Sequence, residues 1–431
     1  MPFGRSPSLD PAKSKGVTAV APMIGESSSV TGTFPKAELL LRSGDEAGTA
    51  PDDRAYRPDV QGMRAVAVLL VVFSHVGIPG MSRGVIGVDV FFVISGFVIT
   101  GVLLRERAAT GHTGLVAFYG RRARRIIPMA TLVIAIVVIV DRFVDGATLA
   151  SGVSIAGRWD AMFQANTVFF QNLLHDTYSG PTPPPKMAGL AVYWSLSVEE
   201  QFYLVYPALF LVIMAAGGRW SVRRRLGVLL TTITVASLAY SFATNPSFVA
   251  YFSTLTRAWE LAVGGLLAVG SIWLKKLPKS MAAAMTWVGL GGVLFLVLAH
   301  NADNEIGVWP RSVPIWIVAA TALVIAGGTA APRLGAELLL KLTPFKWVAL
   351  WSFSLYLWHK PIYLWAVQLK GQLSVPEELL TAGIAVAVSA GSYFLVENPL
   401  RHSQYLARSG VRSLLLGLGL IASCVLLTIA I

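Results

Sequence analysis

The chain has 431 residues, of which 55% are hydrophobic and only 13% are charged. Soluble domains carry about 25% charged residues, so these charges are too few to cover a water-soluble protein of this length. The single cysteine, Cys424, excludes a disulfide framework, an iron-sulfur cluster and a cysteine-rich zinc site. The composition therefore predicts an all-α polytopic membrane protein, because helices satisfy their own backbone hydrogen bonds in lipid.

Residues 1–56 differ from the rest of the chain. They are rich in Ser, Pro, Gly, Ala and charges of both signs, and they contain no sustained apolar run. Such a segment cannot bury a core, so we expect a disordered tail. Its most apolar stretch, Val17–Ile24, is too short for a membrane span and lacks a signal-peptide pattern. We therefore expect the N-terminus to be cytoplasmic.

From Gly62 onward, apolar runs near the roughly 20 residues needed to cross a bilayer alternate with short polar breaks. We expect about 11 transmembrane helices, ten in one bundle and one more, at residues 62–79, 85–104, 126–144, 193–216, 227–244, 254–274, 281–299, 313–331, 347–369, 378–397 and 413–431. The longest external break, 145–192, ends in a proline-rich run and would form a lid or a short re-entrant piece.

The sidedness of Lys and Arg supports this topology. With the N-terminus inside, the cytoplasmic breaks hold 19 of these residues and the external breaks hold five. Cytoplasmic loops concentrate positive charge, so topology accounts for most of the net charge of +12. We therefore expect no nucleic-acid partner.

Arg64 and His75 form the sharpest pair of ionisable residues inside a span. Eleven positions correspond to a rise of roughly 16 Å and a rotation of about 1100°, close to three turns. Both side chains should therefore share one helix face, with Arg64 near the cytoplasmic mouth and His75 near mid-membrane. A ligand held by its anionic part at Arg64 would place a reactive end beside His75. The alternative is that Arg64 is a topology anchor and His75 bonds a neighbouring helix.

Further polar side chains gather at membrane depth on separate helices, which predicts a shared polar interior. They are Asp89, Ser95, Glu199, Glu200, Arg257, Glu260, Tyr356, His359, Lys360 and Glu397. The chain shows no metal-ligand spacing among its histidines, so we expect no metal site.

Arg122 and Arg125 belong to a run of four arginines directly before the third predicted span. Guanidinium groups bind phosphate through two parallel hydrogen bonds, so this run suits a polyanionic ligand at the inner surface. The alternative is that these residues are only topology anchors.

These residues lie in segments that together resemble the acyltransferase type 3 family of integral-membrane O-acyltransferases. The segments are Tyr56–Ala65 with His75 further on, Gly87–Phe97, Arg122–Arg125, Trp194–Tyr203 and Ser354–His359. The resemblance covers about residues 56–400. Several motifs in the same order make it far more specific than any one of them.

The resemblance implies transfer of an acyl group, usually acetyl, from cytoplasmic acyl-CoA to a hydroxyl of a cell-envelope glycan or glycolipid. It implies donor binding by Arg64, Arg122 and Arg125, and catalysis at His75. Acyl-CoA would be a substrate and not a permanently bound cofactor. His75 would act as general base or carry the acyl group transiently. Glu199, Glu200 or Glu260 would orient His75 or bind the acceptor.

The resemblance also implies the surroundings of the protein. We expect a bacterial inner (plasma) membrane location, with acyl-CoA, membrane lipids and an envelope glycan or glycolipid as partners. Many relatives continue into an extracytoplasmic SGNH hydrolase-like domain, whereas this chain stops at Ile431. Either this domain is absent from the sequence given, or a separate SGNH-type periplasmic partner supplies its function. The expected divisions are a tail (1–56), an acyltransferase domain (57–400), and a linker with the eleventh helix (401–431).

A secondary transporter of a small anionic or acylated substrate is the alternative function. It would also bury Arg, His and Glu in a helix bundle. Transporters of this kind are typically built from internal repeats, and the sequence shows none.

Overall fold

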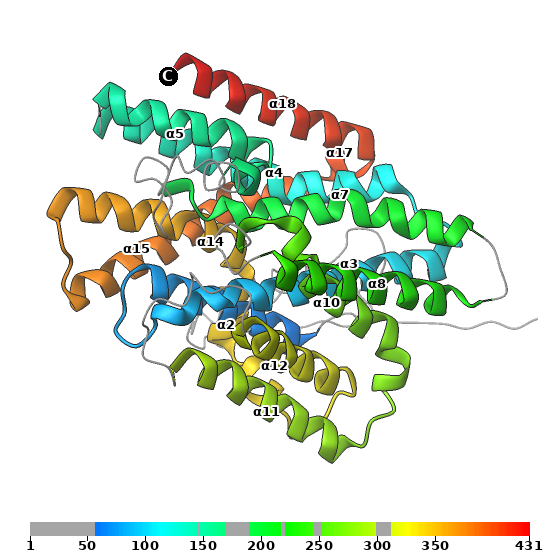
Figure 1. Cartoon of the computed structure of the whole chain (residues 1–431). Coiled ribbons are helices and arrows are strands. Elements are labelled where there is room, and N and C mark those ends of the chain that lie inside the picture. The colour runs from blue at the N-terminus through cyan, green and yellow to red at the C-terminus, as the bar shows by residue number, and fades with distance from the viewer. Residues whose placement is uncertain (1–56, 145, 169–188, 217–219, 245–250, 299–311) are drawn as a thin grey trace, which may run out of the picture. The chain divides into compact units, whose positions relative to one another are not determined.

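The computed structural model consists of helices joined by turns, and the residues that it describes include no strand. It describes residues 57–431 except 145, 169–188, 217–219, 245–250 and 299–311. The predicted tail and the proline-rich part of the longest predicted break lie outside the described residues. Residues Asp52–Ile431 form one compact unit, which contains every helix named below (Figure 1).

The helices follow one another along the chain with short connections. They are α2 (Pro58–His75), the 3-10 helix η1 (Ser82–Ile86), α3 (Gly87–Thr110), α4 (Leu115–Val144), α5 (Gly146–Ala161), α7 (Tyr193–Ala215), α8 (Val222–Ala243), α10 (Thr254–Leu274), α11 (Lys279–Leu298), α12 (Ser312–Thr329), α13 (Glu337–Leu340), α14 (Thr343–Lys370), α15 (Val375–Ser392), the π-helical turn η4 (Tyr393–Glu397), α16 (Asn398–Arg401), α17 (Gln404–Ala407) and α18 (Gly410–Ala430). Each predicted span overlaps one of these helices.

Eight helical segments of the described chain are long and apolar enough to cross a bilayer. They are Ser82–Thr110, Leu115–Phe143, Tyr193–Ala215, Val222–Ala243, Thr254–Leu274, Lys279–Leu298, Val375–Ala407 and Gly410–Ala430. The other three predicted spans form α2, α12 and α14. Of these, α2 and α14 carry the polar residues discussed below. The protein is therefore an all-α, multi-pass membrane protein.

The start of α4 differs from the prediction. This helix begins at Leu115, whereas the apolar run was expected to begin a span at residue 126. Arg122 and Arg125 therefore lie within a helix and not in the break before it. Hydropathy marks where apolar residues begin, but a helix continues beyond that point as long as its backbone hydrogen bonds are satisfied. Positions three apart share a helix face, so both arginines point the same way.

Close contact between α3 and α10 depends on two glycines. A Cβ at Gly96 would overlap the backbone of Leu261, and a Cβ at Gly264 would overlap the backbone of Val93. Small residues let helices in a membrane approach until their backbones touch. The two helices lie side by side in Figure 1. The α3 helix also contacts α2, and both helices contact α7.

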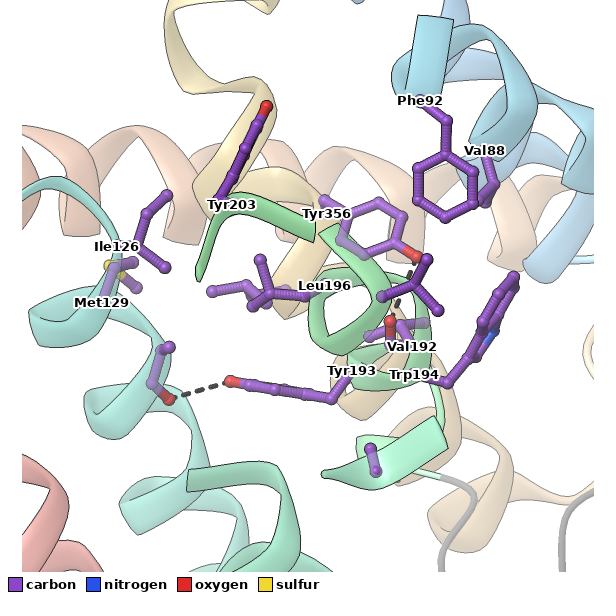
Figure 2. Packing of buried hydrophobic residues seen from close by; sticks show 14 of the residues in the cluster. Val88, Phe92, Ile126, Met129, Val192, Tyr193, Trp194, Leu196, Tyr203 and Tyr356 are labelled. Atoms are coloured by element: carbon purple, nitrogen blue, oxygen red, sulfur yellow. Dashed lines mark hydrogen bonds between the residues drawn. The ribbon is translucent and has the colours of Figure 1, made fainter. Parts of the chain in front are cut away.

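The start of α7 lies in the main buried cluster, between α4, α3 and α14 (Figure 2). Tyr193 donates a hydrogen bond of 2.8 Å to the carbonyl oxygen of Ala130 on α4. On another side of α7, the ring of Trp194 packs edge-on against Phe92 of α3. These contacts position the acidic residues that follow on α7.

The longest predicted break contains α5, which packs on α4 and α18 (Figure 1). Arg158 of α5 donates a 2.9 Å hydrogen bond to the carbonyl oxygen of Thr428. This described part of the break, predicted as a lid or a short re-entrant piece, is thus a helix docked on the bundle. The helix α18 is held to α4 as well, because Arg124 bonds the hydroxyl of Ser413 at 3.1 Å.

Candidate active site

Arg64 and His75 both face α14. The guanidinium of Arg64 donates a 3.0 Å hydrogen bond to the hydroxyl of Ser352. The Nδ1 of His75 lies 2.9 Å from the Nε2 of His359. Both partners belong to α14, so the two side chains share one helix face, as their spacing of eleven residues predicts.

The two histidines form a pair whose hydrogen bonds define the reactive atom. The Nδ1 of His359 lies 3.1 Å from the carbonyl oxygen of Leu355, which can only accept a hydrogen bond. In a neutral ring, Nδ1 of His359 therefore carries the proton and Nε2 is the acceptor. His75 must then donate from its own Nδ1. The Nε2 of neutral His75 is left with a lone pair, which is the state a general base needs.

The histidine pair joins the end of one helix to the interior of another. His75 is the last residue of α2. His359, by contrast, lies well inside α14, eleven residues before Lys370. Since the two rings are in contact, α2 ends deep beside α14, roughly 16 Å from the end of that helix.

Arg122 contacts both acidic residues of α7, Glu199 and Glu200. Its Nη2 lies 2.5 Å from Glu200 and 3.6 Å from Glu199. Its guanidinium also lies 3.6 Å from the ring centroid of Tyr203, which is a cation-π contact. Glu199 in turn accepts a 2.9 Å hydrogen bond from Ser95 of α3. The described contacts therefore bring Glu199 and Glu200 to Arg122 and not to His75.

Arg125 and Arg401 add positive charge to the same region. Arg401, Arg64 and Arg122 all lie close enough to Arg125 to repel it electrostatically. The Nε of Arg125 is buried and has no hydrogen-bond partner among the described residues. Four guanidinium groups thus meet three carboxylates, those of Glu199, Glu200 and Glu397. We call Arg64, Arg122, Arg125 and Arg401 the arginine cluster. Several partly buried guanidinium groups in one region suit an anionic ligand, because each can donate paired hydrogen bonds to it.

Glu397 enters this cluster through the π-helical turn η4. Its carboxylate accepts a 2.6 Å hydrogen bond from Ser354 of α14. The extra residue in a π-helical turn changes the direction of the side chains that follow, and such turns are frequent at functional sites. The sequence identified Glu397 as polar at membrane depth, but it contained no signal that Arg401 joins the cluster.

The neighbouring arginines of α4 have structural roles. Arg121 pairs with Glu106 at 2.6 Å, and 45% of its side chain is exposed. Arg124 bonds the carbonyl oxygen of Leu406 at 3.1 Å and so anchors the last helices. The four arginines therefore divide by helix face. Only Arg122 and Arg125 join the cluster.

Asp89 and Glu260 are held in a separate buried group. Both accept hydrogen bonds of 2.8 Å from Nη1 of Arg257, which is fully buried. The Nε of Arg257 bonds the carbonyl oxygen of Tyr251 at 3.0 Å. This ion group joins α3 to α10, and the described bonds of Glu260 do not reach His75. The sequence identified all three ionisable residues, but their pairing required the packing of two distant helices.

Tyr356 lies next to the histidine pair. Its ring centroid is 5.8 Å from that of His359. Its hydroxyl is 2.5 Å from that of Ser195 and bonds the carbonyl oxygen of Val192 at 3.1 Å (Figure 2). Tyr356 therefore fixes the start of α7 against α14. The described residues contain no group of three or more His, Cys, Asp or Glu that could hold a metal ion.

Known proteins with similar sequences are O-acetyltransferases. The peptidoglycan O-acetyltransferase OatA of Listeria monocytogenes is 28% identical over 82% of this chain and 57% of its own length. The putative peptidoglycan O-acetyltransferase YrhL of Bacillus subtilis is 29% identical over 80% of this chain and 55% of its own. The O-acetyltransferase OatA of Staphylococcus aureus is 28% identical over 82% and 58%.

The chain spans a little over half the length of these relatives. No solved structure matches it significantly. The family model described as an acyltransferase domain matches residues 57–397, which covers α2 through η4 and so includes every residue of the arginine cluster except Arg401. The match extends over well more than half of the chain, and the chain belongs to this acyltransferase family.

Proposed function

We propose that this protein moves an acyl group, with acetyl expected, from acyl-CoA to a hydroxyl of a cell-envelope glycan or glycolipid, or to a partner that completes the transfer. One observation carries the proposal. The hydrogen-bonded pair of His75 and His359 lies at the end of the same helix that carries Arg64, and both ends of that helix face contact α14.

The arginine cluster would bind the phosphates of acyl-CoA. Arg122 and Arg125 lie on one face of α4, and the buried Nε of Arg125 still offers a hydrogen bond. Glu199 and Glu200 would hold the guanidinium of Arg122 in place for the donor and not act on His75. From this cluster, the pantetheine arm would follow the roughly 16 Å between Arg64 and His75.

The transfer step would use Nε2 of His75. This nitrogen takes the proton of the acceptor hydroxyl while the hydroxyl oxygen attacks the thioester carbonyl carbon. The carbon-sulfur bond then breaks, and the CoA thiolate takes the proton back from Nε2. Throughout, the Nδ1 proton of His75 stays on the hydrogen bond to His359, which keeps the imidazole in the required tautomer.

The surroundings are part of the same proposal. The arginine cluster would face the cytoplasm, where acyl-CoA is available, and the protein would reside in the bacterial plasma membrane. The names of the similar proteins support a peptidoglycan or related envelope glycan as acceptor. A separate SGNH-type partner would complete the transfer if the acceptor is reached in two steps.

Purified protein tests this function directly. Wild type should cleave acetyl-CoA and transfer the acetyl group, whereas His75→Ala should lose about 10²- to 10⁴-fold in rate, the usual cost of removing a general base. Size-exclusion chromatography would check that the variant is folded. Wild-type turnover by His75→Ala would contradict the assignment. Mass spectrometry of envelope glycans with and without the gene would identify the acceptor.

A further inference from the structure

Two charged side chains near the histidine pair, Lys360 and Glu378, have polar atoms with no hydrogen-bond or ion-pair partner among the described residues. Lys360 is half-buried and has neither a hydrogen bond nor an ion pair in the part of the chain that the structure describes. Its ammonium lies 5.6 Å from the ring centroid of Tyr363, one turn further along α14. The Oε2 of Glu378 is buried and is likewise without a hydrogen-bond partner among the described residues.

Both charges lie directly beside the end of α2. Lys360 follows His359 in sequence, and its charge acts on both histidine rings. Glu378 lies against Gly77, two residues after His75, so closely that a Cβ on Gly77 would be 2.7 Å from Oε1. Gly77 also has a φ of +90°, which favours glycine. The charge of Glu378 in turn acts on Tyr363.

Neighbouring residues already supply the capping hydrogen bonds and the surface charge at these helix ends. Glu377 caps the start of α15 with Ser374 and pairs with Lys370. The Oε2 of Glu378, in the same first turn, makes no capping hydrogen bond to a described residue. Lys360 lies ten residues, or roughly 15 Å, before the end of α14, so it is not at a helix end where lysines reach the membrane surface.

We propose that Lys360, Tyr363 and Glu378 bind a sugar ring of the acyl acceptor next to His75. This inference rests on the proposed function and adds the three residues that would bind its glycan acceptor. A sugar hydroxyl donates to a carboxylate and accepts from an ammonium, so one ring satisfies both groups. The aromatic face of Tyr363 offers the apolar surface that the C-H face of a sugar requires. We call these three residues the acceptor site.

The acceptor site and the arginine cluster lie toward opposite ends of α14. Ser352, which bonds Arg64, precedes His359 by seven residues, whereas Tyr363 follows it by four. The donor would therefore approach the histidine pair from one end of the helix and the acceptor from the other. Neither substrate would have to pass the other to reach Nε2 of His75.

The test uses the full-length protein with acetyl-CoA and chitopentaose, a soluble pentamer of N-acetylglucosamine. Glu378→Gln, Lys360→Met and Tyr363→Leu should each raise the KM for chitopentaose about tenfold or more, as expected for losing a hydrogen bond to a charged group or a ring contact. The KM for acetyl-CoA should stay the same. Glu377→Gln and Lys370→Met are matched controls from the same two helix ends and should change neither constant.

The possible failures can be told apart. If wild type does not cleave acetyl-CoA at all, the proposed function fails and this inference fails with it. If wild type acetylates chitopentaose but the three variants keep its KM, only the acceptor site is wrong. Cleavage of acetyl-CoA without transfer to chitopentaose would overturn the acceptor site as a sugar site and favour a hydroxyl of a partner protein. The substitutions lie on two helices, so one misfolded variant leaves the others to decide.

Discussion

The hydrogen bonds of His359 determine which nitrogen of His75 is free to act. Sequence spacing alone brings Arg64 and His75 to one face, but it does not identify the residue that holds the imidazole. His359 does this from α14, with its own Nδ1 bonded to the backbone of Leu355. Here a neutral histidine orients the catalytic imidazole, a role that a carboxylate has in many hydrolases.

Substitution of His359 tests this positioning role. His359→Leu should lower kcat, but by less than the loss from His75→Ala, because the base itself remains. The KM for acetyl-CoA should be unchanged, since the donor is held elsewhere. His359→Gln should recover part of the loss, because an amide oxygen can accept the Nδ1 hydrogen bond. Equal kcat for wild type and His359→Leu would show that the contact is only packing.

The arginine cluster makes a second prediction at this scale. Lysine keeps the charge of arginine but lacks its planar pair of donors, so Arg122→Lys with Arg125→Lys should weaken acyl-CoA binding about tenfold or more. Equilibrium binding of acetyl-CoA to purified protein measures this effect. Arg121→Lys with Arg124→Lys changes the other face of α4 equally and should leave the affinity unchanged. Identical affinities for both double variants and wild type would reduce Arg122 and Arg125 to topology anchors.

Among the helices, α3 and α10 make close backbone contact, and a buried ion group joins them. Gly96 and Gly264 let the backbones touch, and the buried group of Arg257, Asp89 and Glu260 joins the same two helices. Apolar surface alone cannot hold helices together in lipid, so close packing and buried hydrogen bonds must do so. The polar residues here are therefore best explained as structural.

Alanine at the two glycines should weaken this contact. Gly96→Ala and Gly264→Ala each force backbone separation, which typically costs about 1–3 kcal/mol. Thermal unfolding in detergent should show a lower midpoint for both. Gly270→Ala is the matched control on α10, because a Cβ there meets no atom within 4 Å. Unchanged midpoints for Gly96→Ala and Gly264→Ala would mean that the helices adjust without cost.

Across the whole molecule, the positions of the arginine cluster and the acceptor site predict that the two substrates approach from opposite faces. In sealed proteoliposomes of fixed orientation, acetyl-CoA on the face carrying the Arg121–Arg125 segment should support transfer. Acetyl-CoA confined to the other face should not, because the guanidinium groups that bind its phosphates would be out of reach. Equal activity from both faces would favour a one-sided acyltransferase.

Composition, apolar runs and helical spacing were enough to predict the fold class and the main candidate residues of the site. Few charges, apolar runs and the distribution of Lys and Arg predicted an all-α membrane protein, and each predicted span overlaps a helix. The eleven-residue spacing of Arg64 and His75 predicted a common face, because helical periodicity depends only on position along the chain. The motifs also predicted the family that the comparison confirmed.

Only the tertiary structure decided which residues meet. The sequence could not show that His359 bonds His75, that Glu199 and Glu200 gather on Arg122, or that Arg401 joins the cluster. These contacts join residues that are far apart along the chain, and their choice depends on how whole helices are rotated and packed. A π-helical turn that redirects Glu397 likewise leaves no mark in hydropathy. Periodicity determines the face of a helix, whereas packing determines what that face contacts.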